Sequence, residues 1–555
     1  MNKKKLILLS VLSGLILSFA WWDLMFAPLM LVAFVPLLLM EDSISNNLKP
    51  EKKTSWKVFL YSYPAFLLWN ATTVYWITYS TPLGVAIPFF EAALMSLTFQ
   101  LAHFCKRSFA VGKAWTDIFF AIFFLTFEQL QLNWDLNFPW LASGNSFAKY
   151  PALVQWYEYT GVAGGTLWIW LCNIAIFALL KSFLERRKSN KETKISFLKT
   201  IFCFLILFLP IFVSLIRWFT YVPQQGKAVE VIAVQPNLDP YNEQYDFSPR
   251  QVCDKVVELT SREITPNTDF VICPESCLQD YAWEERIESS PSVDYLRKFQ
   301  NQYPKVEIIA GMSSRRILPE GVVTKAARPF RDVSNRYYEC CNIAIKISRD
   351  TNQASSQLRH KSVLTPFVEK MPFKSALSFL GDLALDLGGT VGTLGTDEKA
   401  TLFTSEAKPK TATMICYESV DGEYVAEFVR KGAEILFIIT NDGWWKDSPG
   451  HRQHAAFARL RAIETRRPIA RSANTGISCF VSPKGEQTQQ TEYWEEAVIK
   501  QELIPQNKIT FYATYGNYIY RAASFLAVLF LLLSIVSSHL RKKEIGNLIK
   551  TQNNV

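Results

Sequence analysis

The sequence lacks the short motifs that mark common hydrolases and metal sites. It contains neither GxSxG nor HExxH, which argues against a serine hydrolase and a zinc protease. It has no CxxC pair, no repeat and no low-complexity segment. His451 and His454 offer two possible metal ligands with no third nearby, so we interpret them as residues of a helix surface. We therefore expect no metal and no cofactor.

Apolar residues are concentrated towards the two ends of the chain. Hydrophobic residues make up 49% and aromatic residues 14% of the 555 residues, which is rich for a soluble protein. Runs long enough to cross ~30 Å of hydrocarbon lie near 5–22, 24–40, 57–79, 82–104, 114–132, 156–182, 196–218 and 522–540. These runs predict an α-helical transmembrane bundle of about eight helices that carries a large soluble domain. Glu91, in the fourth run, is expected to face the bundle interior or the soluble domain because a carboxylate is costly in lipid.

Basic residues cluster in alternate loops between these runs. The clusters lie at 3–5, 49–57, 106–113, 181–194 and 541–543. The positive-inside rule assigns these loops to the cytoplasm, so the soluble domain is expected on the other side of the membrane. Cleavage of the first run as a signal peptide would leave this orientation unchanged. The loops also explain most of the net charge of +9, and we expect no nucleic-acid partner.

Seven of the ten cysteines lie in the soluble domain. They are Cys253, Cys273, Cys277, Cys340, Cys341, Cys416 and Cys479. An odd number leaves at least one unpaired, and several, such as Cys273 in DFVIC, have the surroundings of buried strand residues. The sequence does not indicate which cysteines form disulfides.

The soluble region alternates apolar strands with helical stretches. Strands are expected at VEVIAVQ, DFVIC, VEIIAG, CNIAIKI, ATMIC, EILFII, PIARSA and ISCFV, and helices near 248–262, 291–303, 422–431 and 447–465. The strands lack polar alternation, as in sheets covered by helices on one face and by a second sheet on the other. We predict a bundle over 1–222, an α/β domain over 223–515 and a final membrane helix with a cytoplasmic tail over 516–555.

Three ionisable residues stand where apolar strands become polar: Glu275 after DFVICP, Lys361 in RHKSVLTPFVEKMPF, and Cys416 at the end of ATMIC. Each alone is more often a solvated cap, a surface lysine or a core cysteine. Together they supply a soft nucleophile, a base and a cation for a developing oxyanion. This combination favours acyl transfer through a thioester.

The chain resembles apolipoprotein N-acyltransferase, a membrane-embedded member of the nitrilase superfamily. The resembling features are PES, KSVLTPFVEKMPF, ICYES, NDGWW, RLRAIETRRPIARSANTGIS and the eight flanking apolar segments. The resemblance implies a nitrilase-like αββα sandwich, with Cys416 as nucleophile, Glu275 as general base and Lys361 as oxyanion stabiliser. It also implies supporting roles, which belong to Glu369, Tyr417, Glu418, Trp444 on a mobile loop, and an aromatic residue of QPNLDPYNEQYD, either Tyr241 or Tyr245.

The activity implied by this resemblance is transfer of an acyl chain from a membrane phospholipid to the α-amine of a diacylglyceryl-cysteine at the N-terminus of an apolipoprotein. The reaction would be ping-pong, in a bacterial inner membrane, with the catalytic domain in the periplasm. Residues 376–395 are hydrophobic and glycine-rich enough for a lid or a membrane-facing arm, and a helix packed on the sheet is an alternative. Two other functions stay open: a membrane-tethered amidase that hydrolyses its acyl-enzyme, and a non-catalytic envelope scaffold.

Overall fold

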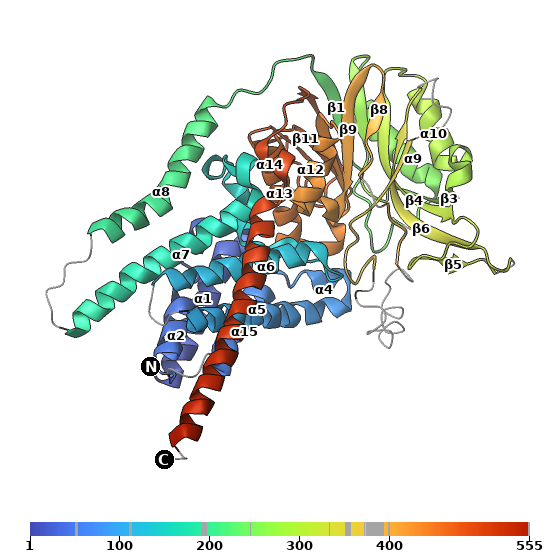
Figure 1. The fold of residues 1–555 in the computed structure, drawn as a ribbon. Helices are drawn as coiled ribbons and strands as arrows, with labels where there is room; N and C mark the ends of the chain where they lie inside the picture. The colour runs from blue at the N-terminus through green and yellow to red at the C-terminus, as the bar shows by residue number, and fades with distance from the viewer. Residues whose placement is uncertain are drawn as a thin grey trace.

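The structure is a computed structural model of the whole chain. It describes residues 1–49, 54–109, 114–189, 197–244, 246–331, 333–349, 357–370, 372, 393–397 and 400–552. Two parts make up the molecule: a helical bundle and an α/β domain that packs against one end of it (Figure 1).

Helices form at the apolar runs expected from the sequence. The bundle helices are α1 (Lys3–Trp21), α2 (Val35–Asn46), α3 (Trp56–Thr73), α5 (Ile87–Phe109), α6 (Ile118–Asn133), α7 (Tyr157–Ser189), α8 (Phe197–Thr220) and α15 (Tyr518–Gln552), with a short α4 (Ile77–Ser80). Within the described residues, six segments are long and apolar enough to span a membrane: Lys3–Leu24, Ala27–Asn46, Pro82–Phe109, Tyr157–Arg186, Phe197–Thr220 and Tyr518–Leu540. The remaining two, α3 and α6, have 18 and 16 residues, so a count of eight spanning helices stays a prediction.

The second run differs from its prediction. A continuous helix over 24–40 was expected, but the chain forms 3-10 turns at Trp22–Leu24 and Ala27–Leu31 before α2 begins at Val35. Pro28 and Pro36 mark this interruption, because each stands in the first turn of its helical segment, where the missing backbone N–H of proline leaves no helix hydrogen bond unmade.

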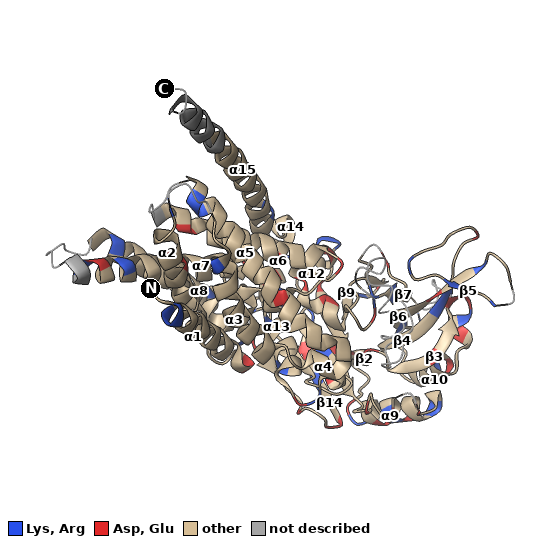
Figure 2. Ribbon diagram, turned by 90° about the horizontal axis from the view of Figure 1, so that it is seen from below, with Lys and Arg blue, Asp and Glu red and all other residues tan. Residues whose placement is uncertain are grey.

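The bundle has an apolar outer surface and an apolar core that contains a few buried polar groups. Charged residues are sparse along its helices and common over the α/β domain (Figure 2). The apolar window of α8 is only 11% buried, which suits a helix that contacts lipid. Glu91 is buried, as expected, and accepts a hydrogen bond of 2.5 Å from Gln131. Glu128 is buried too and accepts hydrogen bonds from Ser143, Thr166 and Tyr520.

The α/β domain contains two sheets face to face. The first has the order β14-β1-β2-β4-β6-β5, with β3 beside β4 and β7 beside β6. Its strands are β1 (Val229–Gln235), β2 (Thr268–Ile272), β3 (Leu278–Trp283), β4 (Glu307–Ile317), β5 (Arg328–Pro329), β6 (Tyr337–Ile347), β7 (Gln357–His360) and β14 (Ala497–Leu503). The second has the order β13-β12-β11-β10-β9-β8. Its strands are β8 (Phe403–Ser405), β9 (Lys408–Ile415), β10 (Ile435–Thr440), β11 (Ile469–Ala473), β12 (Cys479–Val481) and β13 (Gln487–Thr488).

Helices cover the outer face of each sheet. α9 (Pro249–Ser261) and α10 (Pro291–Gln300) pack on the first sheet, and α12 (Gly422–Arg430) and α13 (Pro449–Thr465) on the second. Between the sheets, the rings of Phe270 and Phe437 meet at 5.4 Å. Apolar strand residues are therefore buried on both faces, which explains their lack of polar alternation. The expected αββα sandwich is confirmed.

The bundle and the α/β domain share a core across α13. This helix is buried nearly all round, because one side packs on the second sheet and the other on the bundle. Buried polar contacts cross the junction: Gln453 of α13 accepts a 2.7 Å hydrogen bond from the indole of Trp140, and Glu464 accepts one of 3.1 Å from the backbone N–H of Val162. The domain boundaries given above stay a prediction.

All ten cysteines are free, and nine of them are buried. Cys273 is fully buried in the outer core of the first sheet, as its sequence surroundings indicated. Residues 376–392 of the expected lid lie outside the described residues.

Replacing Gly311 of β4 with alanine should destabilise the protein, because Gly311 packs directly against the backbone of Glu275. A Cβ at 311 would lie 2.5 Å from the Cα of Glu275 and 2.6 Å from the carbonyl oxygen of Pro274, and backbone cannot yield as a flexible side chain can. We expect Gly311→Ala to lower the free energy of unfolding by ~1–3 kcal/mol, measured by thermal or denaturant unfolding in detergent. Gly226→Ala is the control, since its Cβ would meet only Ile504 at 3.6 Å. Equal stability of the two variants would contradict the prediction.

Candidate active site

Cys416 lies at the sharp turn that follows β9. It is the first residue of a 3-10 turn, Cys416–Val420, and has a φ of +51°, a left-handed conformation that is uncommon for a residue with a side chain. The carbonyl of Cys416 holds this turn by accepting hydrogen bonds from Ser419 Oγ (2.8 Å) and His454 Nε2 (3.2 Å). Strained backbone of this kind persists where the surroundings over-determine it, and it concentrates at functional sites.

Glu275 and Lys361 form an ion pair in the same site. Glu275 follows β2, and Lys361 directly follows β7. The ammonium of Lys361 is 2.9 Å from Glu275 Oε1 and 2.9 Å from Glu369 Oε1. One buried ammonium therefore joins two carboxylates from distant parts of the sequence.

Two asparagines that the sequence interpretation missed fix these carboxylates. Asn342 Nδ2, on β6, donates to Glu275 Oε1 (2.8 Å) and to Glu369 Oε1 (3.2 Å). The backbone N–H of Asn441 donates to Glu275 Oε2 (3.1 Å). A polar residue inside the apolar strand CNIAIKI is the signal that could have identified Asn342.

The charges act strongly on one another because the site is buried. Burial alone would lower the pKa of Lys361, but Glu275 and Glu369 outweigh it and raise that pKa well above its usual range. Burial tends to raise the pKa of Glu369, yet the Lys361 ammonium and the Thr365 N–H hold it below its usual range. Burial and the negative charge of Glu275 raise the pKa of the Cys416 thiol well above normal, against the opposing effect of Lys361. Cys416 is therefore a thiol at neutral pH until a base takes its proton.

Glu418 connects the turn at Cys416 to the chain around Lys361. It is fully buried and accepts hydrogen bonds from Arg359 Nη2 (2.7 Å) and from the backbone N–H groups of Ser362 (2.6 Å) and Ile415 (2.7 Å). These contacts tie the end of β9 to the chain on either side of Lys361.

Tyr417 points from the turn Cys416–Val420 towards the bundle. Its ring stacks on Trp140 with centroids 6.4 Å apart, and its hydroxyl donates to the carbonyl of Asn137 (3.2 Å). It also lines an apolar pocket of about 460 Å³, open space included, whose walls come from both parts of the molecule. The lining residues are Trp76, Ile77, Ser80, Ile87, Leu136, Phe138, Thr365, Pro366, Val368, Tyr417 and Trp445.

Trp444 lies at the rim of this region, in the 3-10 turn Asp442–Trp445. Its ring meets that of Tyr241 edge-on at 5.2 Å, and its carbonyl accepts a 2.8 Å hydrogen bond from the Tyr241 hydroxyl. Tyr241 thus fills an aromatic position beside the loop, whereas Tyr245 lies outside the described residues. The neighbouring Trp445, not Trp444, lines the apolar pocket.

The expectation that His451 and His454 lie on a helix surface is wrong. Each is only 1% exposed, because α13 is covered by the sheet on one side and the bundle on the other. His454 Nδ1 lies 2.9 Å from Asp442, which also pairs with Arg471 at 2.6 Å. Cys416, Asp442 and His454 lie close enough to hold a metal by distance alone, but Asp442 is already paired at 2.6 Å with the Arg471 guanidinium, whose positive charge opposes a bound cation. We interpret this cluster as a brace for the turn Cys416–Val420.

Sequence comparison identifies the family to which the chain belongs. The family model described as carbon-nitrogen hydrolase matches residues 231–509, so the chain belongs to that family. A second model, the apolipoprotein N-acyltransferase N-terminal domain, matches residues 13–175 in the bundle.

Relatives similar over nearly the whole chain carry one name. An apolipoprotein N-acyltransferase of Chlorobaculum tepidum is 27% identical over 92% of this chain and 92% of its own length. One of Haemophilus influenzae is 26% identical over 98% and 97%. A crystal structure of a nitrilase-superfamily protein of Saccharomyces cerevisiae is 17% identical, with a TM-score of 0.36 over 51% of this chain and 93% of that one. The resemblance to apolipoprotein N-acyltransferase predicted from the sequence is confirmed.

Neutralising Glu275 should make the resting Cys416 thiol easier to ionise. The Glu275 charge helps to raise the pKa of Cys416, so Glu275→Gln should lower that pKa and shift the pH profile of alkylation at Cys416 to lower pH. Peptide mass mapping after timed exposure to iodoacetamide measures the profile. Glu258→Gln, on the exposed face of α9, is the matched control and should leave it unchanged. An unshifted profile in Glu275→Gln would mean that the carboxylate does not act on the sulfur.

Truncating Glu418 should unfold the domain rather than merely weaken substrate binding. Glu418→Ala leaves the buried Arg359 guanidinium without its carboxylate, which costs ~3–5 kcal/mol. The matched change Glu427→Ala removes a half-exposed pair with Lys431 and should cost ~1 kcal/mol or less. Denaturant unfolding measures both. A Glu418→Ala protein with normal stability and a raised KM would instead favour direct substrate contact.

Proposed function

We propose that this protein is an apolipoprotein N-acyltransferase that uses Cys416, Glu275 and Lys361 to move an acyl chain from a phospholipid to the N-terminal amine of a diacylglyceryl-cysteine lipoprotein. The proposal rests chiefly on one juxtaposition. A nucleophile turn under the charges of Glu275 and Lys361 borders an apolar pocket that is partly built by the membrane bundle.

The first half-reaction forms a thioester. Glu275 takes the Cys416 proton as the sulfur attacks the ester carbonyl of the phospholipid. Two N–H groups of Lys361 go to Glu275 and Glu369, and its third is available for the oxyanion of the tetrahedral intermediate. When the intermediate collapses, the C–O bond breaks, and the lysophospholipid alkoxide leaves with the proton held by Glu275.

The second half-reaction releases the sulfur. The lipoprotein amine attacks the thioester carbonyl and gives a proton to Glu275, and the C–S bond breaks to form an amide and restore the thiol. Ping-pong kinetics follow, because the lysophospholipid departs before the amine reacts.

The pocket favours transfer over hydrolysis. Its apolar walls suit an acyl chain and disfavour water, which would otherwise consume the thioester. The bundle also keeps both lipid substrates in the bilayer, since extracting them costs ~0.8 kcal/mol per methylene. The positive-inside rule supports the proposed membrane orientation, in which the protein lies in a bacterial inner membrane with the α/β domain in the periplasm.

The acyl-enzyme should be visible by mass. We expect purified protein in detergent, incubated with phospholipid, to gain one acyl group that maps to Cys416, and to lose it when a diacylglyceryl-cysteine peptide is added. Cys416→Ala should gain none, whereas Cys340→Ala, which changes a partly exposed thiol of the same domain, should behave as wild type.

Two outcomes would separate the alternatives. Release of free fatty acid with no acylation of the peptide would favour the membrane-tethered amidase. Absence of any adduct on Cys416, together with full activity of Cys416→Ala in cells, would favour the scaffold.

A further inference from the structure

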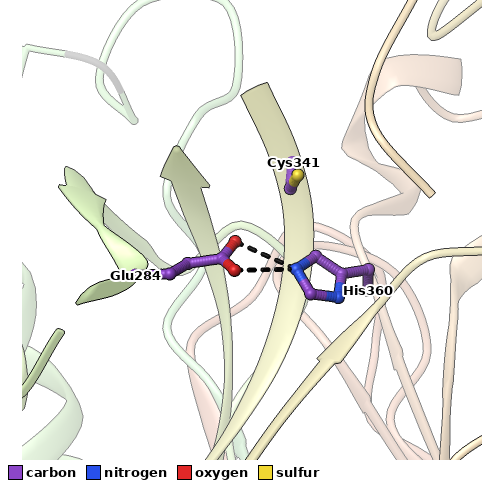
Figure 3. A group of neighbouring side chains, drawn as sticks. All are labelled: Glu284, Cys341 and His360. Carbon is purple, nitrogen blue, oxygen red and sulfur yellow. Dashed lines mark hydrogen bonds and ion pairs between the residues drawn. The ribbon is translucent and has the colours of Figure 1, made fainter. Parts of the chain in front are cut away.

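A second cluster of reactive side chains lies apart from the nucleophile turn. Glu284 follows β3, Cys341 belongs to β6, and His360 ends β7. The carboxylate, the sulfur and an imidazole nitrogen all lie within 4.8 Å of one another (Figure 3). These residues come from three separate segments, so the cluster cannot be recognised from a spacing motif in the sequence.

The imidazole of His360 is oriented as in a metal ligand. Its Nε2 faces Glu284 and lies 3.0 Å from each carboxylate oxygen. Its Nδ1 lies 2.9 Å from the carboxylate of Asp397. A histidine that binds a metal through one nitrogen generally donates from the other to a carboxylate or carbonyl, which fixes the ring and strengthens the ligand.

We propose that Glu284, Cys341 and His360 bind a divalent metal ion of the kind that takes mixed sulfur, nitrogen and oxygen ligands, of which Zn²⁺ is the best fit, with Asp397 as the carboxylate behind His360. Thiolate, imidazole and carboxylate together are a zinc ligand set. Glu284 could chelate through both oxygens, or a water could complete four-coordination.

The surrounding charges suit such an ion. Glu284 and Asp397 are the acidic side chains in contact with His360, and their negative charges favour a cation at this cluster. A divalent ion would be neutralised by the Glu284 carboxylate and the Cys341 thiolate that bind it. Arg316 is already paired with Glu339 at 2.7 Å and with Asp397 at 3.3 Å.

Asp397 is the most exposed side chain of this group. It is 25% exposed, whereas the side chains of Glu284 and His360 are about one-tenth exposed. Gly395 lies against the cluster, since a Cβ there would lie 2.8 Å from the Cys341 sulfur. A bound ion would fix the end of β7, and Lys361 is the next residue along the chain. The ion would therefore position Lys361 and take no part in the reaction itself.

Zinc binding to the full-length protein tests the proposal independently of acyl transfer. Protein in detergent, stripped with a chelator, should bind one equivalent of Zn²⁺ in competition with a chromogenic chelator and unfold at a temperature a few degrees higher when loaded. Co²⁺ in place of Zn²⁺ should give the charge-transfer absorption of a thiolate ligand.

Adjacent cysteines provide a matched pair of variants. Cys341→Ala should lose the thiolate absorption and weaken Zn²⁺ binding at least tenfold, and Cys340→Ala should retain both. Cys341→Ser and His360→Gln serve if the alanine variant does not fold, and each should weaken binding similarly. Failure of the wild type to bind Zn²⁺, or equal binding by wild type and Cys341→Ala, would overturn the proposal.

Discussion

One buried positive charge holds the candidate site together. The Lys361 ammonium is 1% exposed and sits between the carboxylates of Glu275 and Glu369. Removing a charge from water costs several kcal/mol, so each partner is needed to compensate the others. Because Glu275 follows β2 and Glu369 lies in the loop after β7, this compensation fixes how the strand ends approach each other. The turn Cys416–Val420 is tied to this arrangement through Glu418, which binds the chain on both sides of Lys361.

The bundle does more than anchor the α/β domain. α13 forms a wall of both parts. His451, His454, Arg461 and Glu464 of this helix are buried, and Glu464 accepts a hydrogen bond from the backbone of Val162 in the bundle. Trp140 is shared in the same way, because its ring stacks on Tyr417 and its indole N–H donates to Gln453. The apolar pocket is also built from both parts, since α4, the first residue of α5 and the turn after β9 all line it. In this protein the membrane part therefore supplies some of the surface that a substrate would meet.

Much of the fold could be predicted from periodicity and hydropathy. Long apolar runs dictate helices wherever the chain enters hydrocarbon, and uninterrupted strands such as EILFII dictate a sheet buried on two faces. Pro28 and Pro36 indicate an interrupted helix over 24–40, and the prediction of a continuous helix did not take them into account. Glu275 and Cys416 could be singled out because each follows an apolar strand, whereas Lys361 follows the polar strand QLRH and was supported mainly by the motif KSVLTPFVEKMPF. Asn342 stands out as a polar residue in an apolar strand, but its two carboxylate partners could not be predicted. The same holds for Asp442 and for the buried state of His454, because these contacts depend on which distant segments meet, and a periodic pattern carries no such information. For the same reason Glu284 and His360 look like surface residues until the strands are assembled.

The course of the chain limits how the two parts can move. The chain passes from α8 into the α/β domain at β1. After β14 it returns through α14 (Phe511–Tyr515) to α15, which runs back along the bundle (Figure 1). With both ends fastened and α13 embedded between them, a hinge that swings one part away from the other would have to break a continuous core. If two lipid substrates enter in turn, as the proposed function requires, we expect local rearrangement where Tyr241 and Trp444 meet and no separation of the two parts.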